Sequence, residues 1–359
     1  MSLEDETRRQ VEKPHCTPQT LLSFIQLTYT LPDNGLDPAS LTPLSSHDDL
    51  NFRAHTTTSL HAYVLKIHNG VASQNPALLA AQSAAMRHLN AHGVPAPAPV
   101  TTTAGADWAF IGLPPREGAP PGECSRRYAV RVMTWVDGEI AAEESERPGE
   151  HAPALLRAVG GFVGRMSNAL ASFAHPGTAR RHLRDVANAL SFRELLPFVE
   201  NPSRRAMAES ILADFERTVL PLASSLPRAV LHNDANDHNI LVRDAHPFAI
   251  IDFGDIVTSW RVNDPAISAA YFALGKPDPV AAAAAVLAGP CSTTTPPTAP
   301  SSSPPPPPPP SSPSPTSSPP GASTSPPSPP PPSPRRRPSP ATPWPRPRRC
   351  SRGSRRGAG

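Results

Sequence analysis

The chain has 359 residues and a formal net charge of +3, but its 51 prolines and its charges are unevenly distributed. Residues 291–359 hold 26 of the prolines and nine arginines but no aspartate or glutamate, so the preceding 290 residues carry six net negative charges. This composition excludes a packed core at the end of the chain, and the acidic balance of the rest argues against a nucleic-acid partner. We therefore predict a folded domain over residues 21–289, a polar leader over 1–20 and a disordered tail over 290–359.

The first half of the chain predicts strands with one long helix. A short helical pattern over residues 20–27 is followed by a strand over His61–Ile67, which is rich in β-branched and aromatic residues. Apolar residues recur near helical spacing over Asn75–His92, and a glycine follows where a helix C-terminus favours one. A second apolar strand is predicted over Ala129–Val136.

The second half is mostly helical in pattern. Helices are predicted over residues 151–173, 192–199, 203–222 and 265–274, followed by an alanine-rich stretch that ends near Gly289. Strands followed by helices favour an α+β fold with two lobes over one doubly wound sheet. The first lobe would be small and β-rich and extend to about residue 137, and the second would be mainly helical.

Cysteine spacing and hydropathy predict the cellular compartment of the protein. The four cysteines form no CxxC pair and no metal spacing, which argues against a disulfide framework or a zinc site. The N-terminus is too acidic for a transit peptide, and no apolar run approaches the ~20 residues that a membrane span needs. We therefore expect a cytoplasmic protein with no membrane partner.

The tail allows two interpretations. Polyproline tracts such as Pro304–Pro310 are typical of ligands for SH3 or WW modules. Alternatively, the tail is an out-of-frame or misjoined coding segment. We favour this second interpretation because the helical pattern stops abruptly at Pro290 and proline repeats replace it.

The residues best suited to chemistry lie between Val230 and Asp255. In this segment Asp234 is followed five positions later by Asn239 and thirteen positions after that by Asp252. Phosphoryl transfer needs a carboxylate to orient and deprotonate the attacking hydroxyl, together with oxygen ligands for Mg²⁺ on the nucleotide phosphates. One Asp, one Asn and a second Asp can supply these groups.

The intervening residues predict how these side chains meet. Residues 240–242 and 248–251 are two short apolar runs separated by turn residues, as in a β-hairpin. A hairpin brings its ends together, so Asn239 at its entry and Asp252 at its exit would face one site. Their hard oxygen ligands suit Mg²⁺.

A hydrolase metal site is the alternative for this segment. His232, Asp234, Asp237 and His238 are all possible metal ligands. We consider it the weaker interpretation because it leaves the hairpin and Asp252 unexplained. Asp237 and His238 are interpreted as loop residues that satisfy backbone groups, Asp255 as a cap of the next turn or helix, and Asp264 as a helix N-cap before a proline.

The H-x-D-x-x-x-x-N pattern and the following aspartate resemble those of the aminoglycoside phosphotransferase and choline kinase superfamily. The resemblance implies that Asp234 is the catalytic base, that Asn239 and Asp252 are metal ligands and that His232 shapes the loop. Asn233 stands where the superfamily usually has glycine, with the spacing intact. Asp185 is a possible substrate contact by resemblance alone.

Further motifs are similar to those of the hydroxylysine kinase group within that superfamily. They are NDHNIL at 236–241, IDFGD at 251–255, DDLNF at 48–52 and YVLKI at 63–67. The resemblance implies that Lys66, one of only three lysines in the chain, pairs with nucleotide phosphates. Asn51 would lie in the phosphate-covering loop, which contains no glycine, and Gln82 would hold the lysine where many members have glutamate.

The resemblance implies a protein-kinase-like fold with the nucleotide between the lobes. The implied reaction transfers the γ-phosphoryl group of GTP or ATP, with Mg²⁺, to a hydroxyl of a small amine or amino acid, with 5-hydroxy-L-lysine favoured. The alternative is a catalytically impaired nucleotide-binding or interaction protein. It arises because the helical pattern ends at residue 289, where relatives continue with further helices, so the C-terminal lobe could be incomplete.

Overall fold

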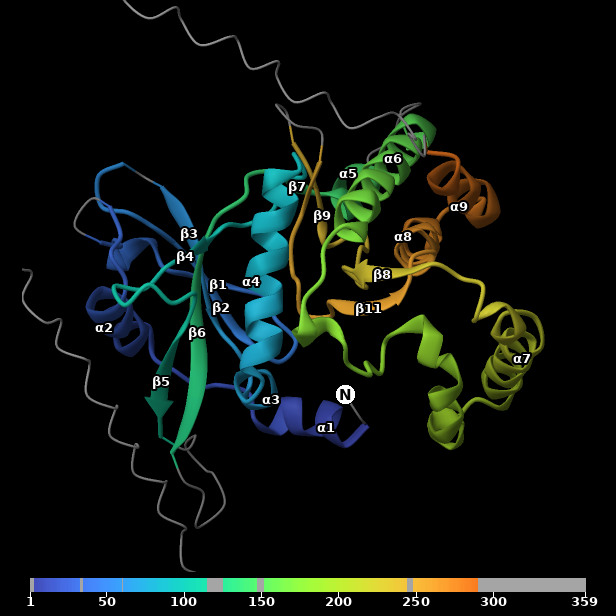
Figure 1. Ribbon diagram of the computed structural model, residues 1–359, viewed down its shortest axis with the longest axis horizontal. Coiled ribbons are helices and arrows are strands. Elements are labelled where there is room, and N and C mark those ends of the chain that lie inside the picture. Colours follow the sequence, from blue (N-terminus) through green and yellow to red (C-terminus); the bar gives the residue numbers. More distant parts are fainter. Residues whose placement is uncertain are drawn as a thin grey trace, which may run out of the picture. The chain divides into compact units, whose positions relative to one another are not determined.

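The computed structural model describes residues 3–32, 35–59, 61–114, 125–146, 152–243 and 248–289. The predicted tail over 290–359 lies outside these residues. The elements within them form two lobes (Figure 1), which confirms the α+β prediction. Among the helices of the described ranges, none combines the length and the apolar character needed to cross a membrane.

The N-terminal lobe is an antiparallel sheet with the strand order β1-β2-β3-β6-β4, in which β5 also pairs with β6. Its strands are β1 (Thr42–Leu44), β2 (Leu50–His55), β3 (Ala62–Ile67), β4 (Pro99–Val100), β5 (Ala109–Leu113) and β6 (Arg126–Thr134). Its helical elements are α1 (Leu3–Val11), α2 (Pro18–Thr28), η1 (Pro38–Ser40), α3 (Gly70–Ser73) and α4 (Pro76–Ala91). The strand predicted over 61–67 and the helix predicted over 75–92 are both confirmed.

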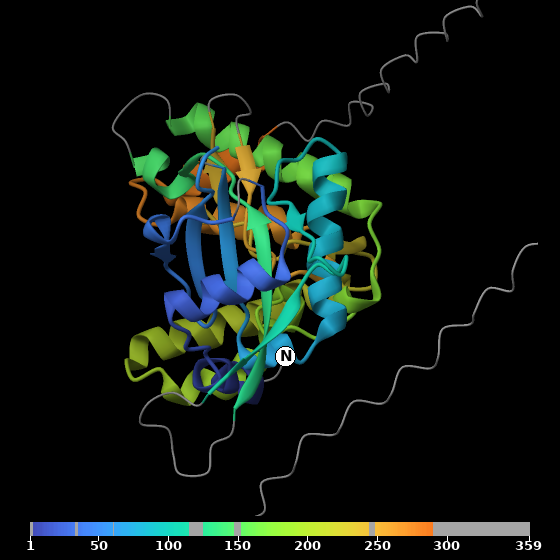
Figure 2. The same ribbon diagram turned by 90° about the vertical axis from the view of Figure 1, so that its left-hand side faces the viewer.

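Two helices cover opposite faces of this sheet, α2 on one side and α4 on the other (Figures 1 and 2). Leu21 and Ile25 of α2 share one hydrophobic core with Leu65 and Val130 of the sheet. This core forms because β3 buries every second side chain, as an amphipathic strand does. Residues 3–11, predicted as part of a polar leader, form α1 and belong to the same compact unit as the lobes.

The C-terminal lobe is mainly helical, with two small antiparallel sheets ordered β10-β9-β7 and β11-β8. Its strands are β7 (Glu139–Ile140), β8 (Arg228–Leu231), β9 (Ile240–Val242), β10 (Phe248–Ile250) and β11 (Val257–Trp260). Its α-helices are α5 (Ala141–Glu146), α6 (Ala152–Ala171), α7 (Pro202–Thr218), α8 (Asn263–Ala273) and α9 (Pro279–Leu287). The remaining segments η2 (Pro176–Thr178), η3 (Val186–Phe198) and η4 (Leu220–Leu222) are 3-10 in geometry.

Two predicted helices differ from the structure. The helix predicted over 192–199 lies in η3, which is interrupted by non-helical backbone at Asn188 and contains Pro197. A proline inside a helix has no backbone N–H to donate and its ring clashes with the preceding turn, so a regular α-helix is disfavoured there. The helix predicted over 203–222 ends earlier, at Thr218, and a 3-10 turn follows it.

The core of the C-terminal lobe includes one face of α4. Met86 and Leu89 of α4 pack in the same cluster as Phe162 and Met166 of α6 and Phe272 of α8. Figure 1 shows α4 standing between the sheet and the C-terminal helices. The helix begins where Asn75 accepts a hydrogen bond from Leu78 N at 3.0 Å and ends before Gly93, whose φ is +72°.

Candidate active site

The loop between β8 and β9 fixes Asp234. The Nδ2 group of Asn239 donates to Asp234 Oδ2 at 2.8 Å and to its backbone carbonyl at 2.9 Å. The Nδ2 group of Asn236 donates to Asp234 Oδ1 at 2.8 Å. Each carboxylate oxygen is therefore held by one amide, which orients the side chain without neutralising it. Sequence reasoning missed Asn236, although it belongs to the NDHNIL motif.

The carboxylate of Asp264 anchors the first residues of this loop. Its two carboxylate oxygens accept hydrogen bonds from the backbone N–H groups of His232 (3.1 Å) and Asn233 (2.8 Å), and its side chain is fully buried. The expectation that Asp264 caps a helix is wrong, because α8 begins one residue earlier and the N-cap position is occupied by Val262. Burial raises the pKa of Asp264 to about 6, while the two N–H donors oppose that shift.

The backbone of Asn233 explains why asparagine can replace glycine at this position. Its φ is +64°, in the left-handed region that glycine adopts freely and asparagine tolerates better than most residues. Both polar atoms of its buried side chain lack a hydrogen-bond partner within the described part of the chain. The residue therefore serves the loop through its backbone conformation.

This geometry predicts a difference between two substitutions at the same position. Asn233→Ala should be less stable than Asn233→Gly by about 1 kcal/mol, because only the alanine variant carries a Cβ that clashes at positive φ. Urea denaturation of the two variants measures the difference directly. Equal stabilities would show that a Cβ carries no penalty at this φ, so the backbone conformation would not explain the residue at this position.

His232 connects this loop to the segment after β10. Its side chain is fully buried, and its Nε2 pairs with the backbone carbonyl of Ile251 at 3.0 Å. Burial lowers the pKa of His232 to about 4, so the ring is neutral near pH 7 and its Nε2–H donates to that carbonyl. The ring also meets Phe253 edge-on, with 4.9 Å between the ring centroids.

The hairpin of β9 and β10 places Asn239 beside Asp252. Ile240 pairs with Ile250 at the end of the ladder, and Ile251 N donates to Asn239 O at 2.9 Å. Asp252 has a φ of +59° and an exposed carboxylate, whose Oδ1 accepts from Gly254 N at 3.1 Å. Asn239 uses its Nδ2 on Asp234, and its Oδ1 accepts no hydrogen bond from the residues that the structure describes. The hairpin thus presents two oxygen ligands from its two ends.

Lys66 of β3 reaches this site from the N-terminal lobe. Its Nζ lies 2.8 Å from Asp49 Oδ2 and 3.5 Å from Asp252 Oδ1. Burial alone would lower the pKa of Lys66, but the carboxylates of Asp252 and Asp49 raise it above its ordinary value, so the ammonium is charged. Asp49 is itself fixed by Asn69, whose backbone N and Nδ2 both donate to Oδ1 at 2.8 Å.

Gln82 does not pair with Lys66, contrary to the sequence-based prediction. The Oε1 atom of this buried side chain accepts a hydrogen bond from Arg131 Nη1 at 3.0 Å. Arg131 of β6 is fully buried and its Nη2 also donates to Leu79 O at 2.7 Å. Gln82 therefore joins α4 to the sheet, and the carboxylates of Asp49 and Asp252 balance the charge of Lys66.

Asn51 lies next to Lys66 across the sheet. The two residues are register partners on β2 and β3. The Oδ1 atom of Asn51 is buried and has no hydrogen-bond partner within the described residues. An unpartnered buried amide oxygen is costly, which is consistent with a ligand group that it contacts when the site is filled.

A cavity of about 270 Å³ between the lobes is bordered by Asp49, Asn51, Asp234 and Asp252 of this set. The lining comprises Arg9, Ser45, Ser46, His47, Asp48, Asp49, Asn51, Arg184, Asp234, Asp252, Gly254 and Asp255. Burial raises the pKa of Asp234 to about 7, and the nearby carboxylates of Asp255 and Asp252 add to the effect. A carboxylate with a raised pKa at a cavity wall is well suited to accept a proton from a bound hydroxyl.

A basic segment before η3 holds the chain that follows Asp252. Arg180 donates to Gly254 O at 2.9 Å and to Ile256 O at 3.0 Å. Asp255 is buried and pairs with His182 Nε2 and with Arg184 Nη1, each at 3.1 Å. Asp255 is thus an ion-pair partner and not the cap that we expected. The sequence signal that could have identified these partners is the density of basic residues in ARRHLR.

Asp185 has a structural role. Its buried carboxylate accepts hydrogen bonds from Ser259 Oγ at 2.7 Å, Asn263 Nδ2 at 3.1 Å and Ala187 N at 3.0 Å. These contacts tie the start of η3 to β11 and α8. The suggestion that Asp185 contacts substrate is therefore not supported.

The alternative of a hydrolase metal site also lacks support. Among the residues that the structure describes, no three His, Cys, Asp or Glu side chains gather in a way that could hold a metal. His232 points to Ile251. The prediction that Asp237 and His238 satisfy backbone groups is not supported: His238 donates its own backbone N–H to Asn236 Oδ1 at 2.9 Å, and Asp237 Oδ1 is buried without a hydrogen-bond partner among the described residues. An Asn and Asp pair of the kind seen at Asn239 and Asp252 needs no such cluster.

Comparison with known proteins agrees with this geometry. The model of the phosphotransferase enzyme family (APH) matches residues 40–300. Hydroxylysine kinase from Mus musculus is 27% identical over 265 residues, which cover 68% of each chain. The same enzyme from Xenopus laevis is 27% identical over 289 residues, 75% of this chain and 73% of that protein.

A solved structure supports the fold alone. The microcompartment-associated aminopropanol kinase aligns with a TM-score of 0.51 at 14% identity, over 71% of this chain and 75% of that one. The family match spans most of the part that forms the two lobes. The resemblance inferred from the motifs is confirmed, and the chain belongs to the phosphotransferase enzyme family, as a small-molecule phosphotransferase.

Proposed function

We propose that this protein transfers the γ-phosphoryl group of ATP or GTP to a hydroxyl of a small amine or amino acid, with 5-hydroxy-L-lysine as the favoured acceptor. The observation that carries the proposal is the arrangement of Asp234 between two amides, in a cavity that also contains Asp252. The acceptor follows from the hydroxylysine kinases among the relatives.

The roles follow from the contacts. Asp234 would orient the acceptor hydroxyl and take its proton as the O–P bond forms. Lys66, charged and paired with Asp49 and Asp252, would bind nucleotide phosphates, and the amide oxygen of Asn51, unpartnered among the described residues, would accept a hydrogen bond from a donor group of the ligand. Asp49, the ion-pair partner of Lys66, would hold the ammonium group in place before nucleotide binds.

The donor set fits Mg²⁺. Asp252 offers an exposed carboxylate, and Asn239 offers an amide oxygen that has no partner in the described ranges. Both are hard ligands that leave room for water and phosphate oxygens. When bound, the ion would neutralise charge that develops on the phosphates. The protein's share is to hold these two oxygens at the end of one hairpin.

A panel assay tests the proposal. Purified protein is incubated with Mg²⁺ and either ATP or GTP and with hydroxylated amines and amino acids led by 5-hydroxylysine, and nucleoside diphosphate release is measured. Release that depends on one acceptor supports the proposal and identifies that acceptor. If the protein binds Mg²⁺-nucleotide but releases no diphosphate with any acceptor, it is the catalytically impaired binding protein instead.

A further inference from the structure

Helix α1 is fixed to the N-terminal lobe by contacts of the residue that follows it. The buried Glu12, just after α1, accepts a backbone hydrogen bond from Gly70 at 3.0 Å and forms an ion pair with Arg126 at 2.8 Å. A Cβ atom on Gly70 would overlap the Glu12 side chain, so α1 and α3 meet through a glycine that leaves space for this carboxylate. Specific contacts of the buried Glu12 therefore hold the end of α1 in place.

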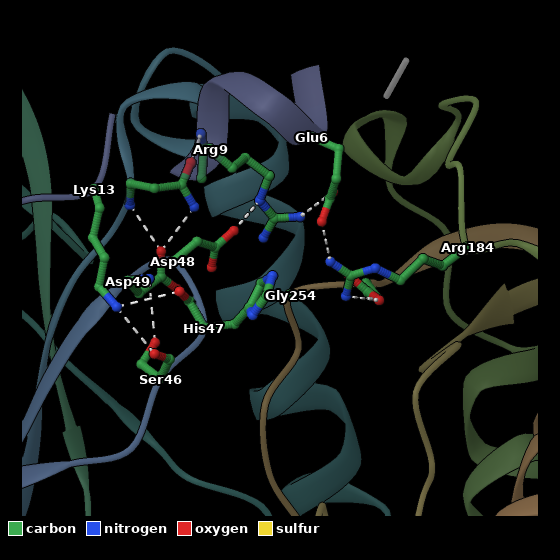
Figure 3. Close-up of polar contacts among 12 residues, drawn as sticks. Glu6, Arg9, Lys13, Ser46, His47, Asp48, Asp49, Arg184 and Gly254 are labelled. Carbon is green, nitrogen blue, oxygen red and sulfur yellow. Dashed lines mark hydrogen bonds and ion pairs between the residues drawn. The ribbon is translucent and has the colours of Figure 1, made fainter. Parts of the chain in front are cut away.

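Lys13, which directly follows Glu12, forms hydrogen bonds to the loop over residues 45–49, and this loop lines the cavity. Its Nζ donates to Ser46 O at 3.1 Å and to His47 O at 3.2 Å (Figure 3). The carbonyls of Ser46 and His47 share their peptide groups with the N–H groups of His47 and Asp48. In a trans peptide the N–H points opposite to the C=O, so these two N–H groups point away from Lys13. Neither N–H has an acceptor within the described part of the chain. Successive free N–H groups are suited to bind an anion.

Arg9 and Glu6 extend these contacts across the cleft. Arg9 forms an ion pair with Asp48 on the loop, and its Nη1 lies 3.8 Å from Glu6 Oε2 (Figure 3). Glu6 also accepts from Arg184 at 2.8 Å, and Arg184 pairs with Asp255 in the C-terminal lobe. A continuous chain of ion pairs therefore runs from the loop through α1 to the segment that follows the proposed metal ligand.

We propose that Lys13 and Arg9 are positioning residues of the nucleotide site, an inference that rests on the proposed function. Lys13 fixes the loop so that its backbone N–H groups can bind the nucleotide phosphates, a task that glycine-rich loops perform through their own flexibility. Arg9 neutralises Asp48, whose carboxylate on the cavity wall would otherwise repel phosphate. The loop contains no glycine, and α1 supplies the support that it lacks.

The test compares Lys13→Gln with Lys276→Gln, a matched loss of one lysine charge outside the cavity. Isothermal titration calorimetry measures the Kd of Mg²⁺-ATP, and steady-state kinetics measures KM for each substrate. Lys13→Gln should raise the Kd and the nucleotide KM about tenfold, as expected when hydrogen bonds from a charged group are lost. Lys276→Gln should leave both near wild type, and Lys13→Arg, which keeps the charge and the donors, should restore affinity.

Three outcomes separate this inference from the proposed function. An unchanged Kd in Lys13→Gln, with wild type binding normally, overturns the positioning role and leaves the proposed function standing. If wild type binds no nucleotide, the proposed function fails and this inference fails with it. If Lys13→Gln does not fold, Arg9→Gln decides the question against the exposed control Arg217→Gln, by the same tenfold criterion.

Discussion

Replacing Asp234 with asparagine is expected to lower kcat by about 10²–10⁴-fold, the range typical of a lost general base. The raised pKa of Asp234, due first to burial and then to Asp255 and Asp252, suits a group that must take a proton near neutral pH. Asparagine has nearly the same shape but cannot accept that proton. The Kd of Mg²⁺-nucleotide should change little, because Lys66 and Asp252 are intact.

The matched control is Asp237→Asn in the same loop, to which no catalytic role is assigned. It should retain kcat close to wild type. Comparable losses in both variants would mean that kcat responds to any change in this loop and that Asp234 is not the base. Equal thermal midpoints for both variants and wild type would exclude unfolding as the cause.

Replacing Asp264 with alanine is expected to cost about 3 kcal/mol of unfolding free energy, because two buried backbone N–H groups lose their acceptor. Those groups belong to His232 and Asn233, which start the loop that carries Asp234. Activity should fall together with stability, since the loop loses its anchor. Urea denaturation with the linear extrapolation method measures the free energy.

A suitable comparison is Asp278→Ala, which removes the exposed N-cap of α9. Asp278 accepts one N–H, that of Ala281 at 2.9 Å, so its loss should cost about 1 kcal/mol and leave activity unchanged. If Asp264→Ala is no more destabilising than Asp278→Ala, the two hydrogen bonds to the loop are not what anchors it.

Periodicity and spacing were sufficient to predict the elements that carry the site. The hairpin of β9 and β10 could be predicted because two short apolar runs flank a turn. The register of this hairpin is enough to bring Asn239 close to Asp252. The helix α4 was readable from its apolar spacing and its terminal glycine. Both are local patterns, and local patterns are what a single sequence displays.

The missed features depend on contacts between distant segments. Asp49 pairs with Lys66 from a loop, whereas Gln82, on a helix at a plausible position, bonds to Arg131 instead. No spacing rule distinguishes the two. Similarly, α1 is rich in charged residues of the kind that usually face solvent, and only the fold reveals that Arg9 borders the cavity.

The position of α4 has a consequence for how the cleft can open. One face of α4 belongs to the core of the C-terminal lobe, and His88 of α4 bonds to Ala169 O of α6 at 2.8 Å. The opposite side is joined to the sheet by Arg131 through Gln82 and Leu79. A hinge motion between the lobes would have to break the buried arginine contacts or expose apolar surface of α4, and both are costly. The two lobes are therefore expected to keep their relative orientation while substrates enter and leave the cleft.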